Sequence, residues 1–157
     1  MKVQFVALVL VVAVVSGCKV REAPAPFAVD LRAITPQNIS LLNQKLELSV
    51  DLLNPGPTER VLAHFVYVLT IAGEPFVSGR VQGIRPLKPG HVYQLRVPAT
   101  TDLEGLGQLL AAKRRNSAYN LSGYIVRAYT PGKFAFERSG LMSDLDLKPA
   151  KGAKPGL

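Results

Sequence analysis

The sequence predicts an all-β fold, an antiparallel β-sandwich that carries one short helix. Apolar and polar residues alternate with period two in several short segments, as they do in strands that bury one face. Turn sequences separate these segments, and the chain contains twelve prolines and thirteen glycines. About seven such strands, together with a single helical segment, are typical of a β-sandwich.

The first two strands are predicted from this alternation alone. The buried face of the first consists of Phe27, Val29, Leu31 and Ala33, which alternate with Ala28, Asp30 and Arg32. The second is the clearest strand of the chain. Its buried face consists of Leu46, Leu48, Val50 and Leu52, which alternate with Glu47, Ser49 and Asp51. The turn residues Asn54-Pro55-Gly56-Pro57 then end this strand.

The remaining strands are predicted mainly as hairpins. Residues 63–71 are rich in β-branched and aromatic side chains, and the turn at 72–75 leads into a partner strand over residues 76–81. After a turn at Pro89-Gly90, residues 93–97 alternate again. A last hairpin joins residues 118–129 to residues 133–136 through Thr130-Pro131-Gly132.

One segment has helical rather than strand periodicity. Thr101 and Glu104 have the spacing of a capping box, with Thr101 as the N-cap residue and Glu104 at the third helical position. Apolar residues then recur at helical spacing, namely Leu103, Leu106 and Leu110. Three cations follow where the helix dipole favours positive charge, namely Lys113, Arg114 and Arg115. We predict a short helix over this segment.

Residues 1–17 are predicted to be a lipoprotein signal peptide. Lys2 supplies a positive charge, and the apolar run from Val3 to Val15 is interrupted only by Gln4. A helix that spans a bilayer needs about 20 residues, so this shorter run is typical of the apolar region of a cleavable signal.

The end of this segment, Val15-Ser16-Gly17-Cys18, resembles the bacterial lipobox. The resemblance implies cleavage between Gly17 and Cys18, a diacylglyceryl group on the Cys18 thiol and acylation of the new amino group. Two or three acyl chains hold a protein firmly on a membrane, whereas one gives only reversible attachment. Lys19, which stands where a sorting aspartate would be, implies the periplasmic face of the outer membrane in a Gram-negative cell. The alternatives are an ordinary secretion signal with a chance cysteine, and an uncleaved anchor.

The rest of the chain divides into three parts. We expect a polar tether over residues 18–26, the sandwich domain over residues 27–146 and a disordered basic tail over residues 147–157. The single cysteine excludes an intramolecular disulfide. The formal net charge of +8 either favours anionic partners or only keeps the surface solvated.

The order of the elements resembles the group 2 late-embryogenesis-abundant (LEA) proteins, which contain the water-stress and hypersensitive-response domain. The resemblance rests on an alternating strand that runs into Asn54-Pro55, a hairpin with Gly73 at its turn, a helix, and the closing strand around Leu121-Ser122-Gly123-Tyr124. The family's turn has asparagine at its third position, where this chain has Gly56. The resemblance covers about residues 25–141, and implies an immunoglobulin-like or fibronectin-type sandwich, a link to desiccation and no catalytic residues.

No catalytic, metal or cofactor site is predicted. The two histidines, His64 and His91, have no cysteine or carboxylate at ligand spacing. No nucleophile elbow is present, and the glycines at Gly105 and Gly107 lack the strand and lysine of a phosphate-binding loop. We therefore expect a protein that is not an enzyme and needs no cofactor.

Two functions are consistent with these observations. The first is a membrane-tethered protein with a protective or binding role in the cell envelope under water stress. The alternative is a structural adaptor that docks on an envelope protein complex through an edge strand. We expect a monomer whose partners are the membrane, envelope proteins or an anionic lipid surface contacted by Lys113, Arg114 and Arg115. We expect no nucleic-acid partner, because export removes the chain from nucleic acid.

Overall fold

The computed structural model describes residues 27–39, 43–83 and 86–147. The predicted signal peptide, Cys18 and the tether lie outside these residues, as does the predicted tail from residue 148 onward. The elements in chain order are β1 (Ala28–Ile39), β2 (Gln44–Leu53), β3 (Leu62–Ile71), β4 (Glu74–Gln82), β5 (Val92–Thr101), α1 (Leu103–Arg115), β6 (Ala118–Arg127), β7 (Lys133–Leu141) and the short 3-10 helix η1 (Met142–Asp144). None of the helices in the described ranges is long and apolar enough to cross a membrane.

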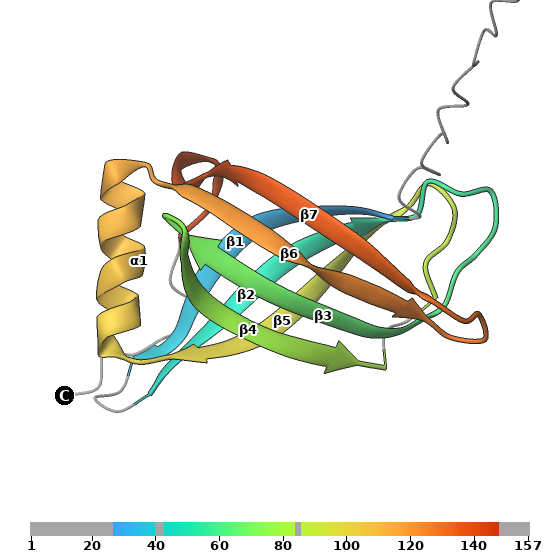
Figure 1. Cartoon of the computed structure of the whole chain (residues 1–157), viewed down its shortest axis with the longest axis horizontal. Helices are drawn as coiled ribbons and strands as arrows, with labels where there is room; N and C mark the ends of the chain where they lie inside the picture. The colour runs from blue at the N-terminus through green and yellow to red at the C-terminus, as the bar shows by residue number, and fades with distance from the viewer. Residues whose placement is uncertain (1–26, 40–42, 84–85, 148–157) are drawn as a thin grey trace, which may run out of the picture.

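The strands form two antiparallel sheets that pack face to face (Figure 1). One sheet has the order β1-β2-β5 and the other has the order β4-β3-β6-β7. The predicted all-β sandwich with one helix is confirmed. Because β4 lies beside β3 and not in the first sheet, the strands are arranged as in the fibronectin variant of the immunoglobulin-like sandwich.

The two ends of the sandwich differ in the elements and connections that lie there. At one end, α1 crosses from the end of β5 to the start of β6, next to the point where β1 ends and β2 begins (Figure 1). We call this the helix end. At the other end, the chain enters β1, and three connections join β2 to β3, β4 to β5 and β6 to β7 (Figure 1). We call this the loop end.

The core lies between the sheets and is built from the predicted alternation. In β2, Leu46, Leu48, Val50 and Leu52 are all buried, which confirms the predicted face of this strand. The facing sheet contributes Phe65 of β3, whose ring stacks on Phe136 of β7 at a centroid distance of 5.0 Å. Burial of these apolar side chains is the main force that holds the two sheets together.

The predicted face of β1 is correct only as far as Leu31. Phe27, Val29 and Leu31 are buried, but Ala33 is only partly buried, and the next core residue is Ile34. The pairing of β1 with β2 shifts between Leu31 and Ala33, which leaves Arg32 as an extra residue. A bulge of this kind moves every later side chain to the opposite face, so strict alternation could not predict Ile34.

The predicted helix is present, but its N-cap residue is Asp102 and not the predicted Thr101. Thr101 remains in β5, paired with Gln44, and Asp102 is the N-cap residue, with its Oδ1 accepting a hydrogen bond of 2.7 Å from the Gly105 N–H. The buried residues are Gly105, Leu106, Leu109 and Ala112, whereas Leu103 and Leu110 are exposed. Gly105 accounts for this orientation, because a Cβ there would collide with Thr101 Oγ1. The glycine therefore lets this side of α1 approach the sandwich closely.

Candidate functional site

The basic cluster predicted to contact an anionic surface lies in the last turn of α1, at the helix end. Lys113 Nζ donates hydrogen bonds to the carbonyl oxygens of Met142 and Leu145, each at 2.6 Å. Lys113 therefore fastens α1 to η1 and to the residue that follows it. Arg114 and Arg115 are exposed, so contact with an anionic surface stays a prediction for these two cations.

The two histidines do not form a site with each other or with carboxylates. His64 is half-buried in β3, and its Nδ1 has no hydrogen-bond partner among the described residues. His91 is exposed, and its Nδ1 lies 2.9 Å from the Pro89 carbonyl oxygen. Within residues 27–39, 43–83 and 86–147, no group of three or more His, Cys, Asp or Glu could hold a metal ion. Cys18, the predicted lipidation site, lies outside the part of the chain that the structure describes.

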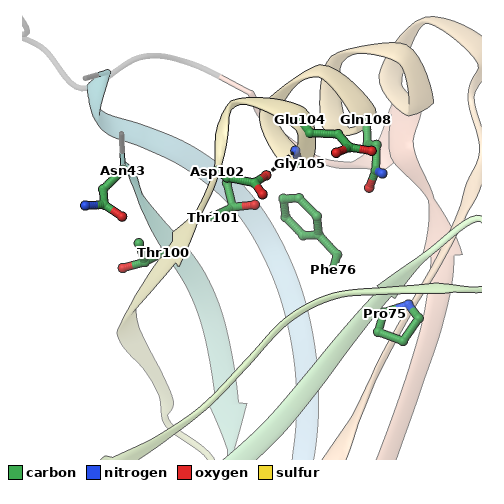
Figure 2. Close-up of a pocket in the computed structure, with 9 residues that line it drawn as sticks. All are labelled: Asn43, Pro75, Phe76, Thr100, Thr101, Asp102, Glu104, Gly105 and Gln108. Carbon is green, nitrogen blue, oxygen red and sulfur yellow. Dashed lines mark hydrogen bonds between the residues drawn. The ribbon is translucent and has the colours of Figure 1, made fainter. Parts of the chain in front are cut away.

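A polar groove of about 520 Å³ lies at the helix end, between the start of β4, the end of β5 and the first turns of α1 (Figure 2). Figure 2 shows the Phe76 ring between β4 and the start of α1, with the polar side chains around it. The residues that line the groove are Asn43, Pro75, Phe76, Thr100, Thr101, Asp102, Glu104, Gly105 and Gln108.

The groove continues into a more apolar hollow of about 300 Å³, which shares Phe76 and Gln108 with it and extends to Ile71 and Ala112. No histidine and no lysine lines either hollow. The Asp102 carboxylate already accepts a hydrogen bond from the Gly105 N–H. The hollows thus combine a half-buried aromatic ring and amide and hydroxyl groups with the charged side chains of Glu74, Asp102, Glu104 and Arg115.

Asn54, from the Asn-Pro turn singled out in the sequence, is fully buried at the loop end. Its Nδ2 donates to the carbonyl oxygens of Thr58 at 2.8 Å and Leu87 at 2.9 Å, and its Oδ1 accepts from the Gly56 N–H at 3.1 Å. The Gly90 N–H also donates to the Asn54 main-chain oxygen at 2.9 Å. The side chain therefore holds the β2–β3 connection against the β4–β5 connection.

An ion-pair network joins the two sheets at their β1 and β7 edges. Asp30 lies 3.2 Å from Arg32 Nη1 and accepts a hydrogen bond of 3.0 Å from Arg138 Nε, while Arg32 Nε donates to Asp51 at 2.8 Å. The hydrogen bond to Asp51 and the charge of Asp30 raise the pKa of the Arg32 guanidinium. Because the two arginines are largely exposed, the network adds little to the stability of the fold.

Two of the features just described could not be found in the sequence. The Lys113 ammonium and its carbonyl partners are about thirty residues apart along the chain, and no local pattern connects them. The groove joins residues of β4, β5 and α1, whose proximity depends on the fold. For Asn54 the turn was predicted, but its bond to Leu87 crosses from one loop to another.

The fold and the site thus define a β-sandwich module with a polar groove at one end. No protein-family model and no curated protein sequence matches the chain. The solution structure of AT1g01470 from Arabidopsis thaliana is similar, with a TM-score of 0.58 and 15% sequence identity over 82% of this chain and 86% of that one. This likeness shows that the two chains share a β-sandwich fold.

Two other solved structures have lower TM-scores. A protein from Archaeoglobus fulgidus has a TM-score of 0.43 and 11% identity over 73% of this chain and 92% of that one. β-Glucuronidase 2 from Bacteroides uniformis has a TM-score of 0.41 and 13% identity, over 74% of this chain but only 13% of the enzyme.

Proposed function

We propose that this chain is a lipid-anchored, non-enzymatic protein of the cell envelope that protects other envelope components under water stress by reversible contact. The observation that carries the proposal is the fold shared over 82% of this chain and 86% of the Arabidopsis protein, which agrees with the resemblance of the sequence to group 2 LEA proteins. The lipobox at Cys18 supplies the tether. The groove beside Phe76 supplies a surface for weak contact with exposed segments of other proteins.

The edges of the sheets favour this function over the adaptor. A strand added to an edge needs a row of free main-chain N–H groups, and proline removes one. Three of the four outermost strands contain a proline, namely Pro36 in β1, Pro75 in β4 and Pro98 in β5. The fourth, β7, presents the charged side chains of Lys133, Glu137 and Arg138. Such edges are poorly suited to docking by strand addition.

Lipidation is tested by Cys18→Ser, with radiolabelled palmitate as the readout. The chain has one cysteine, so the substitution should abolish both the label and the maturation of the precursor. Label that persists in the variant would refute the lipid anchor.

Protection is tested by drying a labile enzyme together with the chain from Cys18 onward and measuring the activity recovered on rehydration. An equal mass of an inert protein is the control, and recovery should be higher with this chain. Phe76→Ser, which changes the half-buried ring of the groove, should lower the recovery, while Phe134→Ser at the loop end should not. No protection by the unaltered chain would favour the adaptor.

A further inference from the structure

The loop end is where the chain leaves toward the predicted lipid anchor. Phe27 and the start of β1 lie at this end, whereas α1 and its basic cluster lie at the other (Figure 1). Nine residues, 18–26, precede Phe27 when Cys18 is included. A fully extended segment of that length spans at most about 30 Å. A lipid on Cys18 therefore keeps the loop end within about this distance of the membrane surface.

The charges at the loop end are nearly all positive. Among the described residues of the three connections and their flanking positions, the cations are Arg60, Lys88, Arg127 and Lys133, and the acid is Glu59. At the helix end the charges balance, because Glu74, Asp102, Glu104 and Asp144 accompany Lys45, Lys113, Arg114 and Arg115. The loop end is thus the end of the sandwich with the net positive charge.

Three of the loop-end cations lie over aromatic rings. Arg127 Cζ is 4.3 Å from the centroid of Phe134, Lys133 Nζ is 4.7 Å from that of Tyr124, and Arg60 Cζ is 5.5 Å from that of Phe27. Such pairs place positive charge and aromatic rings together, which is the combination that favours the boundary between water and lipid.

Tyr129 lies at the tip of the β6–β7 hairpin and is 97% exposed. Its φ is +61°, in the left-handed region where a bulky residue is strained. A hollow of about 330 Å³ lies beside it, lined by Thr58, Glu59, Arg60, Val61, Arg127, Ala128, Tyr129 and Thr130. The buried Nε of Arg127 has no hydrogen-bond partner among the described residues. The hairpin therefore presents an aromatic ring to solvent next to a hollow that Arg60 and Arg127 line.

We propose that the loop end is the face that rests on the membrane: the Tyr129 ring enters the lipid interface, and the loop-end cations contact anionic head groups. This inference rests on the lipid anchor of the proposed function. Tyrosine rings favour the interface because one part of the ring is apolar and the hydroxyl stays hydrated. An anionic surface attracts each nearby lysine or arginine within a Debye length. The α1 cations then point away from the membrane that holds the chain.

The test uses the chain from Cys18 onward, which contains every residue that the structure describes. Its Cys18 thiol is coupled to a maleimide lipid in phosphatidylcholine vesicles, with or without phosphatidylglycerol. The chain has no tryptophan, so Tyr129→Trp and Leu110→Trp each introduce one indole at an exposed position, one at each end of the sandwich. Quenching by brominated lipids reports contact with the bilayer, and quenching by aqueous iodide reports solvent.

We expect the Tyr129→Trp indole to be quenched by brominated lipid when phosphatidylglycerol is present, and the Leu110→Trp indole to be quenched only by iodide. Lys88→Gln should weaken binding of the Cys18→Ser chain to anionic vesicles by about fivefold, and Arg114→Gln should leave it unchanged. Lipid quenching at Leu110→Trp but not at Tyr129→Trp would overturn the proposal, as would equal quenching without anionic lipid. Because the coupling supplies the tether chemically, failure of lipidation in the cell would leave these results as they stand.

Discussion

The side chain of Asn54 joins two loops that are 33 residues apart in the sequence. Its amide is buried against the carbonyl oxygens of Thr58 and Leu87, and a carboxylate of the same shape could not donate to either. We expect Asn54→Asp to lower the free energy of unfolding by about 2–4 kcal/mol, because two buried acceptors lose their donor and face a negative charge. Urea unfolding measures this loss. Asn38→Asp, at an exposed position of β1, is the control, and an equal loss there would contradict the assignment.

The turn between β3 and β4 offers a second test, at Ala72 and Gly73. Both residues have positive φ, +54° and +84°, as a type I′ turn requires. Asparagine tolerates this conformation better than alanine, so Ala72→Asn should stabilise the protein by about 0.5–1 kcal/mol. Gly73→Ala should destabilise it by about 1 kcal/mol, although nothing lies within 4 Å of the added Cβ. Shifts of thermal midpoint with the same sign for both would refute this explanation.

Residue-scale roles were predictable from the sequence where they depend on neighbours in the chain. The glycine turn at 72–73 and the Asn-Pro turn at 54–55 were both predicted, because turn chemistry is local. The hydrogen bonds of Lys113 were not predicted, because their acceptors belong to η1 and to Leu145, far along the chain. Its positive charge indicated a dipole or a surface role, and only the fold brings the carbonyls to it.

At the scale of elements, two neighbouring leucines of α1 show which face of the helix is buried. Leu109 is 0% exposed and Leu110 is 50% exposed. We expect Leu109→Ala to cost about 2–4 kcal/mol through the cavity it leaves, and Leu110→Ala to change stability by less than about 0.5 kcal/mol. The two urea midpoints show which of the two leucines packs against the sandwich. A larger loss for Leu110→Ala than for Leu109→Ala would contradict the observed face.

The predictions for β1 and α1 departed from the structure where a contact lies outside the spacing of apolar residues. Alternation and helical spacing predict that an element exists and roughly where, since they depend on side chains within one element. The phase of β1 after Leu31 depends on the bulge at Arg32, where the main chain also pairs with Asp146 near the other end of the sequence. The buried face of α1 depends on the close contact of Gly105 with Thr101. The first is a tertiary contact and the second a local steric contact, and the spacing of apolar residues describes neither.

At the scale of the whole molecule, burial of two tyrosines makes the fold sensitive to alkali. Burial raises the pKa of Tyr67, and burial followed by the charge of Asp30 raises the pKa of Tyr119. The unfolded chain ionises first, above the ordinary tyrosine pKa of about 10. The stability that the neutral phenols contribute is therefore present below this pH and is lost as the pH rises through the folded pKa values.

Tyr67→Phe tests this dependence. At neutral pH it should cost about 0.5–1.5 kcal/mol, because Tyr67 Oη donates to the Pro98 carbonyl oxygen at 3.2 Å. Between neutral pH and a pH just above the ordinary tyrosine value, the variant should lose less stability than the unaltered chain. Urea midpoints at the two pH values measure the difference. Tyr129→Phe, at an exposed position, should lose as much as the unaltered chain, and a parallel loss in all three would contradict the role of Tyr67.

The sandwich as a whole was predictable because seven alternating segments leave few other ways to bury their apolar faces. The order of the strands within each sheet was not derivable from periodicity, since it depends on which distant segments pair. The placement of the groove and of the cation-rich loops at opposite ends follows from that order.

The bonds of Asn54 have a further consequence, which concerns chemical ageing. Asparagine decays over time when the main-chain nitrogen of the next residue attacks the side-chain carbonyl, expels ammonia and closes a five-membered imide. The next residue here is Pro55, whose nitrogen carries no hydrogen, and the amide is fixed by its two carbonyl acceptors. The junction between the two loops therefore resists this decay, and long storage should not convert its one essential amide into an acid.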